Sequence, residues 1–430
     1  MLVFFNKISI INLIILSLII KIVLFYFIFH EGDLSIFYRP DTYDYIGSMK
    51  SIITAGVFEI DGRPVTLRTP GYPIFLLLGH LAGGVEIISI FLQILISTLT
   101  LFYLYKLTIH ITKKQMIAKI VCSLYLIEPL SLIFSSGLLL SETLLTLFVV
   151  LAVYYFLIFV DNYKTKTIIT SSIFFILALY VKPVVIFLPI ILSIYLLIGK
   201  FSFKHISIFL IIFFIAFGAW SYRNYIATGS FKFSTVSDVN ISLNAISVLY
   251  YKHVDNVSMW NIPVTNLRRE GLDFFFSNID KDKSANDEFL KDINSYRDKN
   301  YFTIFINNFS ISSKIYLTGL FKIVTGIGAS DYFNAFRLGG NKLNIVKSMI
   351  SILLLIQLIF TYFFFIRGRM VFNKNHIKIL LLVISYFVLI SSGVFGYSRF
   401  RMPVMPFIEI ISGYGFYFYL IKRTAKRRLY

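Results

Sequence analysis

Two aspartates open the polar segment that follows the first long apolar run of the chain. Asp41 and Asp44 stand three residues apart in "PDTYDYIGSM", and Pro40 favours the first turn of a helix. A helix that begins there would bring both carboxylates onto one face, where a carboxylate can accept a proton from a hydroxyl. Acids in a first helical turn are also common because they interact favourably with the helix dipole. The pair alone leaves both interpretations open.

Further charged residues stand at the ends of later apolar runs, and a helical bundle would gather them at one rim. They are Arg68, Glu142, Lys182, Arg223, Arg399 and Arg401. Several cations and two or three acids around one opening are typical of a site for an anionic lipid headgroup, because arginine binds phosphate through paired hydrogen bonds. Each arginine could instead reach toward lipid phosphates by itself. Glu142 has an alternative as a helix N-terminal acid, and Lys182 as an anchor at the end of a span.

The elements that must position these residues are membrane-spanning helices. The chain has 430 residues, of which 57% are hydrophobic and only 15% charged, so it lies outside the range of soluble proteins. Its apolar runs of about 17 to 25 residues can each cross a hydrocarbon core of ~30 Å as a helix. We predict spans at 8–29, 86–109, 116–135, 142–160, 167–181, 184–199, 206–222, 346–366, 378–396 and 403–421. Because the runs are continuous and not alternating, the predicted fold class is all-α, a polytopic bundle of about 10 to 12 spans.

Three weaker segments predict helices that lie along the membrane surface. Residues 73–85 are too short to cross alone, and residues 311–327 carry two lysines, so both are interpreted as interfacial or re-entrant. In the late polar region, the roughly helical spacing of four residues predicts an amphipathic helix along the membrane surface: Phe289, Ile293, Tyr296 and Tyr301.

Lysine and arginine predict the orientation. Ten spans place both termini on one side, and the loops rich in Lys and Arg then all fall on that side, which is predicted to be the cytoplasm. This loop charge accounts for the net charge of +19, so no nucleic-acid partner is expected. Residues 30–72 and 223–345 become outer, periplasmic segments, and residues 346–430 hold the last three spans and a basic tail. We predict one integrated domain over residues 1–430, in the cell inner (plasma) membrane.

The sequence gives no strong sign of a cofactor. Cys122 is the only cysteine and lies in an apolar run, which excludes a disulfide framework and a cysteine metal site. Neither a Gly-rich nucleotide loop nor a metal-ligand spacing is present. Asp41 and Asp44 could hold a divalent ion, but no metal is predicted.

The order of four segments resembles a known class of enzymes. The segments are "DTYDYI…AGVF…LRTPGYPIFL", "LLLSETLLTLFVVLAVYY", "WSYRNYIATGSFKFSTVSDVNISLNA" and "YSRFRMPVMPFI". Together they resemble the GT-C class of integral-membrane glycosyltransferases. More narrowly, they are similar to the family of protein O-mannosyltransferases and bacterial lipid A aminoarabinose transferases. The resemblance covers most of the chain and implies a GT-C-like fold.

This resemblance implies transfer of a sugar from a polyprenyl-phosphate-linked donor to a hydroxyl of a glycan, lipid or protein at the outer face. The catalytic acids it implies are Asp41, Glu142 and Asp44, with Asp41 at the position of the essential first-loop acid. The implied donor-phosphate ligands are Arg68, Lys182, Arg223, Arg399 and Arg401, and the predicted substrate contacts are Tyr43, Tyr72, Asn224 and Tyr397. Many relatives have paired acids in the first loop, whereas here Asp41 follows Pro40 and the nearest acid is Asp44.

Two other classes compete with this prediction. A transporter or flippase of lipid-linked sugar would need functional acids near the membrane midplane, for which Glu128 and Glu409 are candidates. An O-antigen polymerase or ligase is chemically close but normally carries its arginines in a large late loop. The charged outer rim favours the transferase, and consumption of a lipid-linked donor would distinguish it from a transporter.

Overall fold

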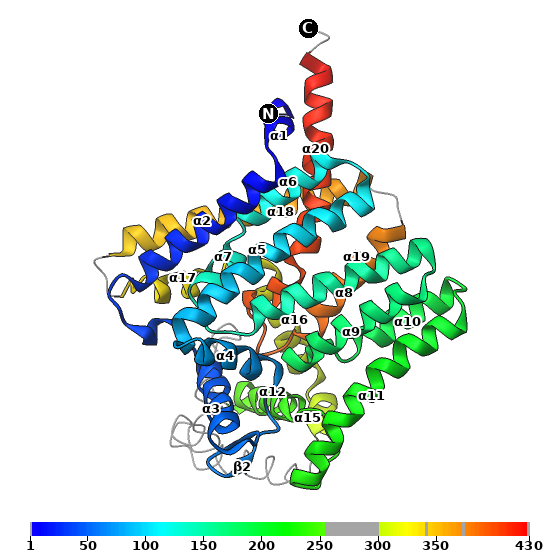
Figure 1. Cartoon of the computed structure of the whole chain (residues 1–430). Helices are drawn as coiled ribbons and strands as arrows, with labels where there is room; N and C mark the ends of the chain where they lie inside the picture. Colours follow the sequence, from blue (N-terminus) through cyan, green and yellow to red (C-terminus); the bar gives the residue numbers. More distant parts are fainter. Residues whose placement is uncertain (1, 254–300, 340–342, 372–374, 428–430) are drawn as a thin grey trace. The chain divides into compact units, whose positions relative to one another are not determined.

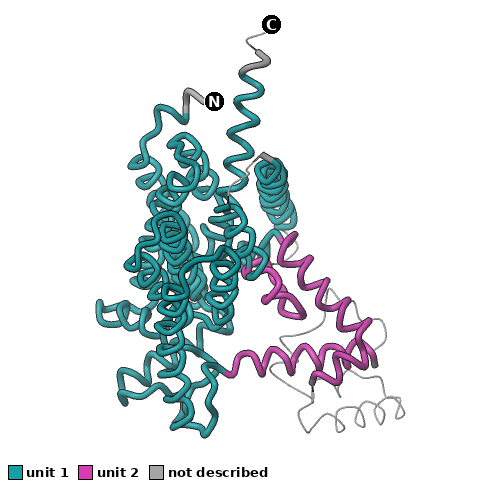
Figure 2. Tube along the Cα trace, turned by 90° about the vertical axis from the view of Figure 1, so that its right-hand side faces the viewer, with its two compact units in different colours: residues 1–234, 327–387, 401–430 teal, residues 235–326, 388–400 magenta. Residues whose placement is uncertain are grey.

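A computed structural model describes residues 2–253, 301–339, 343–371 and 375–427 of the chain, and it is almost entirely helical (Figure 1). Two compact units make up the fold (Figure 2). Unit 1 holds residues 1–234, 327–387 and 401–430, and unit 2 holds residues 235–326 and 388–400. The prediction of one integrated membrane domain is not tested by this division and stays a prediction.

Six helices of unit 1 form its long apolar elements. They are α2 (Ile10–Phe29), α5 (Val85–Thr112), α8 (Glu142–Asn162), α11 (Phe203–Thr228), α18 (Asn344–Val371) and α20 (Met405–Arg427). Within the described part of the chain, these six are long and apolar enough to cross a membrane. Four shorter apolar helices accompany them: α4 (Gly71–Leu81), α9 (Thr165–Val181), α10 (Leu188–Ile198) and α19 (Asn375–Ile390). The predicted fold class, an all-α bundle of a multi-pass membrane protein, is confirmed.

The segment predicted as a span at 116–135 is broken into two helices, which together are long and apolar enough for one bent span. Helix α6 (Gln115–Leu126) and helix α7 (Pro129–Ser136) are bent by 58° relative to each other. Pro129 has no amide hydrogen to continue α6, but it fits the first position of a new helix. The Glu128 carboxylate then accepts hydrogen bonds from the amides of Leu130 (3.2 Å) and Ser131 (2.5 Å) and caps α7.

Helix α8 forms the centre of unit 1. It packs against α5 and α9 (Figure 1). Of its most apolar 18-residue stretch, 72% is buried, because apolar side chains cover all its faces. On another side of the unit, α18 packs against α20 and α20 against α6. Gly368 and Gly415 let the first pair approach closely, since a Cβ at Gly415 would lie 2.1 Å from the Phe364 carbonyl oxygen.

Short elements connect the long helices of unit 1. They are α1 (Leu2–Lys7), η1 (Leu34–Phe37), α3 (Pro40–Ala55), the antiparallel strands β1 (Glu59–Ile60) and β2 (Arg63–Pro64), η2 (Pro183–Val185), α17 (Ala329–Ala335) and η4 (Ser398–Val404), whose first residues belong to unit 2. The first outer loop predicted at 30–72 thus contains η1, α3 and the two-stranded hairpin. The segment predicted as interfacial at 73–85 is covered by α4.

Unit 2 contains three helices among its described residues: α12 (Val236–His253), α15 (Tyr301–Asn307) and α16 (Phe309–Thr325). Helix α12 packs against both others. The Asn244 side chain accepts a hydrogen bond from the amide of Val394 (2.9 Å), which ties α12 to the segment 388–400. The amphipathic helix predicted from Phe289 to Tyr301 lies outside the described residues except for Tyr301, the first residue of α15. The helix predicted at 311–327 corresponds to α16.

Candidate active site

The two aspartates of the first loop share one arginine. Helix α3 begins at Pro40 as predicted, and both carboxylates lie on one face. Arg68 donates from Nη2 to Asp41 Oδ1 (2.7 Å) and from Nε to Asp44 Oδ2 (2.9 Å). The Asp41 and Arg68 side chains are buried, whereas the Asp44 side chain is 36% exposed. A bridge of two charge-assisted bonds fixes the guanidinium plane between α3 and the segment that precedes α4.

The sequence around Arg68 explains its position. In "LRTPGYP", Pro70 caps α4 and Gly71 is its first residue. A Cβ at Gly71 would lie 2.6 Å from the carbonyl oxygen of Tyr180, so only glycine lets this turn approach the last turn of α9. The motif therefore packs the start of α4 against the end of α9, immediately before Lys182.

A second ion pair joins the ends of α8 and α9. Glu142 is the first residue of α8, and its side chain is 1% exposed. Lys182 follows the last residue of α9 and donates from Nζ to Glu142 Oε1 (2.7 Å). A buried carboxylate at this position requires such a partner, since an isolated charge would be costly to remove from water.

Tyr45 lies between the two ion pairs. The Arg68 Cζ stands 5.4 Å from the centroid of the Tyr45 ring, and the Tyr45 hydroxyl is 3.2 Å from the hydroxyl of Ser141, the residue before Glu142. Burial raises the pKa of Tyr45 to about 12; the nearby Arg68 opposes this shift, while Asp41 and Glu142 add to it. The phenol is therefore neutral at physiological pH. We refer to Asp41, Asp44, Arg68, Glu142 and Lys182 with Tyr45 as the paired-charge cluster.

The Arg68 guanidinium keeps its positive charge in this buried position. Burial disfavours the charged guanidinium, but Tyr45, Asp41 and Asp44 outweigh that effect, so the pKa of Arg68 is raised above its usual value. Its bonds to the aspartates use Nε and Nη2, and a guanidinium has five N–H donors. The side chain can thus hold both carboxylates and still present donors of Nη1 to an anion.

Two predicted residues support the first loop from α11. Arg223 donates to the carbonyl oxygens of Phe58 (2.7 Å) and Val65 (3.3 Å), which flank the hairpin of β1 and β2. The side-chain amide of Asn224 donates from Nδ2 to the carbonyl oxygens of Lys232 (2.8 Å) and Phe233 (3.1 Å). Both side chains organise backbone in this structure. Their predicted contacts with donor phosphate and substrate stay predictions.

The predicted substrate tyrosines differ in exposure. Tyr72 is fully buried, meets Tyr45 edge-to-face at 4.8 Å between ring centroids, and donates to Gln93 Oε1 (2.7 Å). The Tyr43 side chain, also on α3, is 64% exposed. Tyr397 and Arg399 belong to unit 2, so the structure of unit 1 does not place them in the paired-charge cluster. Their roles stay predictions.

Arg401 lies in a different polar group of unit 1. It is buried, hydrogen-bonds to Tyr362, and interacts electrostatically with Glu128 and Glu409. Glu409 is also buried and accepts a hydrogen bond from the Thr361 hydroxyl (3.2 Å). These are the two acids that the sequence offers for a transporter, and the structure brings them near one arginine.

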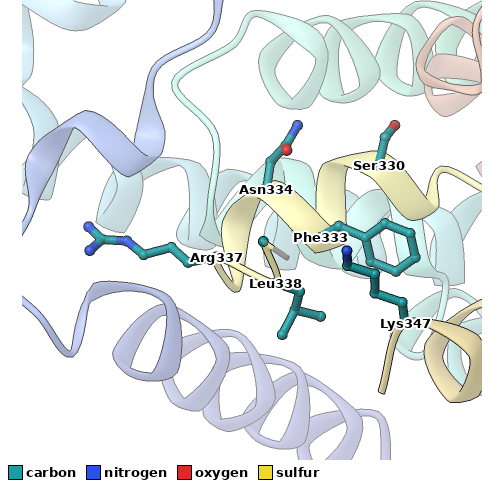
Figure 3. Close-up of a pocket in the computed structure, with 7 residues that line it drawn as sticks. Ser330, Phe333, Asn334, Arg337, Leu338 and Lys347 are labelled. Carbon is teal, nitrogen blue, oxygen red and sulfur yellow. The ribbon is translucent and has the colours of Figure 1, made fainter. Parts of the chain in front are cut away.

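A cavity of about 520 Å³ lies beside α17 and the start of α18 (Figure 3). Its lining includes Asn334, Arg337 and Lys347, and none of the predicted site residues lines it. Arg337 also forms ion pairs with Glu31 and with Asp33. These two acids, which follow α2, therefore already neutralise part of the Arg337 charge.

Sequence reasoning missed Tyr45 and Ser141, which connect the two ion pairs. Tyr45 follows Asp41 by four residues, so helical spacing places it on the same face, and that local signal was sufficient to find it. Ser141 carries no such signal, because its contact with Tyr45 depends on the packing of segments 96 residues apart.

One family of known proteins matches part of the chain. Residues 68–222 match the family described as dolichyl-phosphate-mannose-protein mannosyltransferase. The matched region contains Arg68, Glu142 and Lys182, and Asp41 lies before it. No curated protein matches the chain.

A solved structure to which the chain is similar is the archaeal oligosaccharyltransferase AglB from Archaeoglobus fulgidus, in complex with an inhibitory peptide and a dolichol-phosphate. The two share 12% sequence identity with a TM-score of 0.49, over 99% of this chain and 52% of that chain. The chain thus spans about half the length of this structure. The family match confirms the resemblance, predicted from the sequence, to the GT-C class of membrane glycosyltransferases.

Proposed function

We propose that the protein is a GT-C type glycosyltransferase that moves a sugar from a polyprenyl-phosphate-linked donor to a hydroxyl acceptor at the outer, periplasmic face of the membrane. The observation that carries the proposal is the buried contact of Asp41 with Arg68 (2.7 Å), beside the Glu142 and Lys182 pair. The name of the matching family, dolichyl-phosphate-mannose-protein mannosyltransferase, supports a donor of this class.

The proposed reaction is a substitution at the anomeric carbon of the sugar. The acceptor oxygen attacks this carbon, and the bond from the carbon to the phosphate oxygen breaks, so that the electron pair leaves with the lipid phosphate. The Asp41 carboxylate takes the proton of the acceptor hydroxyl. Arg68 stabilises the negative charge that develops on the phosphate, through donors that its bonds to the aspartates do not use.

The other members of the paired-charge cluster position these two groups. Asp44 holds the second edge of the Arg68 guanidinium, and Tyr45 lies against the guanidinium face. Glu142 and Lys182 fix the ends of α8 and α9 next to Ser141, which contacts Tyr45. A preorganised arrangement of this kind costs no reorganisation at the moment of reaction.

The test uses purified full-length protein with a polyprenyl-phosphate sugar and measures loss of the donor. We expect Asp41→Asn to lower turnover by about 10²- to 10⁴-fold, the range of a general base. Asp61→Asn is the matched control, because Asp61 is an exposed acid of the same loop at φ 51°, a conformation that asparagine accepts. Turnover of the Asp41 variant within a few-fold of wild type would exclude the assignment.

A transporter of lipid-linked sugar is the second candidate, because Glu128, Glu409 and Arg401 are all buried within a membrane protein. The same preparation separates the two functions. A transporter would move the lipid-linked sugar across a vesicle membrane without consuming it, and its rate would depend on Glu409 and not on Asp41.

A further inference from the structure

Three metal-ligating side chains meet in unit 1 outside the paired-charge cluster. His110 lies in the last turn of α5, Asp161 in the last turn of α8 and His376 in the first turn of α19. His110 Nε2 is 2.8 Å from Asp161 Oδ2, and His376 Nε2 is 2.8 Å from Asp161 Oδ1. One ligand atom from each residue can be chosen so that all lie within 4.8 Å of one another.

This triad is far from the proposed chemistry. Glu142 begins α8 and Asp161 stands 19 residues later in the same helix, which at 1.5 Å per residue places them roughly 28 Å apart. That distance is close to the ~30 Å thickness of the hydrocarbon core. The two sites therefore occupy opposite ends of the same central helix, and the triad is not a subsite of the paired-charge cluster.

The hydrogen bonding of His110 leaves its Nε2 available to a metal ion. The ring bonds to the backbone of Leu157, and Nε2 makes no hydrogen bond within the described residues, although it lies 2.8 Å from Asp161 Oδ2. A neutral imidazole whose other nitrogen donates to a carbonyl carries a lone pair on Nε2, the form in which a histidine binds a metal ion. His376 Nε2 hydrogen-bonds to the other oxygen of the same carboxylate at 2.8 Å, so Asp161 contacts both rings.

The two imidazole rings lie close enough to bind one ion. Their ring centroids are 5.8 Å apart, and the Asp161 carboxylate places one oxygen near each Nε2. A metal ion binds an imidazole in its neutral form, through the lone pair of a ring nitrogen.

We propose that His110, Asp161 and His376 form a binding site for a divalent transition-metal ion such as Zn²⁺, which ties the ends of α5, α8 and α19 together. Two imidazole nitrogens and one carboxylate oxygen are a common ligand set for this ion, with water in the remaining position. Zinc ligands at ~2.1 Å from the ion lie roughly 3.4 Å apart, so the side chains need to move by about an ångström or less. The bond from the His110 ring to Leu157 is the outer-shell contact that fixes a ligating imidazole.

The test measures zinc in the full-length protein, purified in detergent without a polyhistidine tag, stripped with a chelator and re-equilibrated with Zn²⁺ alone. We expect one tightly bound zinc per chain in the wild type. His110→Ala and His376→Ala should each weaken binding by about tenfold or more. His205→Ala is the matched control: His205 lies in the first turn of α11, contacts Thr165 at 3.1 Å, and should leave binding unchanged.

Two further measurements keep the test decisive. Co²⁺ bound to the triad should give an absorption spectrum that the His376 variant lacks, and Zn²⁺ should raise the melting temperature of the wild type and the His205 variant only. Neither measurement depends on transferase activity. The proposal is overturned if the wild type binds no stoichiometric zinc, or if binding persists equally in the His110 and His376 variants.

Discussion

At the scale of single residues, the two ion pairs of the paired-charge cluster have different surroundings. Arg68 is shared by two carboxylates, so loss of either leaves it a partner. Glu142 and Lys182 form an ion pair whose carboxylate is fully buried. The fold should therefore tolerate a substitution of Asp41 or Asp44 that tests its catalytic role. Removal of Glu142 or Lys182 alone should reduce the stability of the protein more.

We predict that Lys182→Met destabilises the protein by about 3–5 kcal/mol, because it leaves the Glu142 carboxylate buried without its cation. The double variant Glu142→Gln with Lys182→Met should lose much less stability, because it removes both charges. Thermal unfolding of the single and double variants in detergent gives the coupling energy. Simple addition of the single losses would contradict a coupled buried pair.

The sequence predicted some of these residues and missed others for identifiable reasons. Asp41 and Asp44 could be placed on one face because their spacing and Pro40 are local signals. The bond from Arg68 to Asp41 could not be predicted, because a hairpin separates them by 27 residues. His376 and Asp161 are 215 residues apart and follow no metal-binding spacing, so only the packing of α8 against its neighbours reveals them.

At the scale of elements, the first loop, residues 30–72, depends on α11 for its position. Arg223 binds the carbonyl oxygens of Phe58 and Val65, and its guanidinium also lies 5.1 Å from the ring of Trp220. Ser234, after α11, donates to the Leu67 carbonyl oxygen (2.9 Å) just before Arg68. The loop that carries the candidate catalytic acid is thus anchored at both ends of its hairpin.

Arg223→Met should release this hairpin while keeping the aliphatic part of the side chain. Hydrogen bonds to a charged donor contribute about 1.5–3 kcal/mol, so amide exchange in residues 56–67 should accelerate by tenfold or more. Hydrogen exchange followed by mass spectrometry measures this directly. Arg63→Met, an exposed change in the same hairpin, is the control. Equal exchange in the Arg223 variant and wild type would refute the anchoring role.

The packing of α18 against α20 gives a second prediction at this scale. A Cβ at Gly415 would meet the Phe364 carbonyl oxygen at 2.1 Å, which neither backbone can accommodate without moving. We expect Gly415→Ala to destabilise the protein by about 1–3 kcal/mol. Gly218→Ala in α11 should be neutral or slightly stabilising, since nothing lies within 4 Å of a Cβ there. The melting temperatures of both variants test this prediction. An unchanged melting temperature for Gly415→Ala would contradict the close contact.

At the scale of the whole molecule, the central helix α8 relates the two polar sites to the membrane. Its 21 residues span about 30 Å, the thickness of a hydrocarbon core. The predicted orientation rests on lysine and arginine in the loops, and it places the loop after α8 in the cytoplasm and the first loop outside. The sequence could predict this arrangement because charge bias is read along the chain. The bend between α6 and α7 changes the path of one span, but the side of each loop is decided by the charges around it.

Accessibility of introduced cysteines tests this orientation in intact cells. Cys122 is fully buried, so the wild type should not react with a membrane-impermeant maleimide. We expect Arg63→Cys, exposed in the first loop, to be labelled in intact cells, and Lys164→Cys, exposed after α8, to be labelled only once the membrane is permeabilised. Labelling of both variants under the same condition would place the paired-charge cluster and the His110, Asp161 and His376 triad on one side. In that case α8 would not cross the membrane, and an outer catalytic face would lose its support.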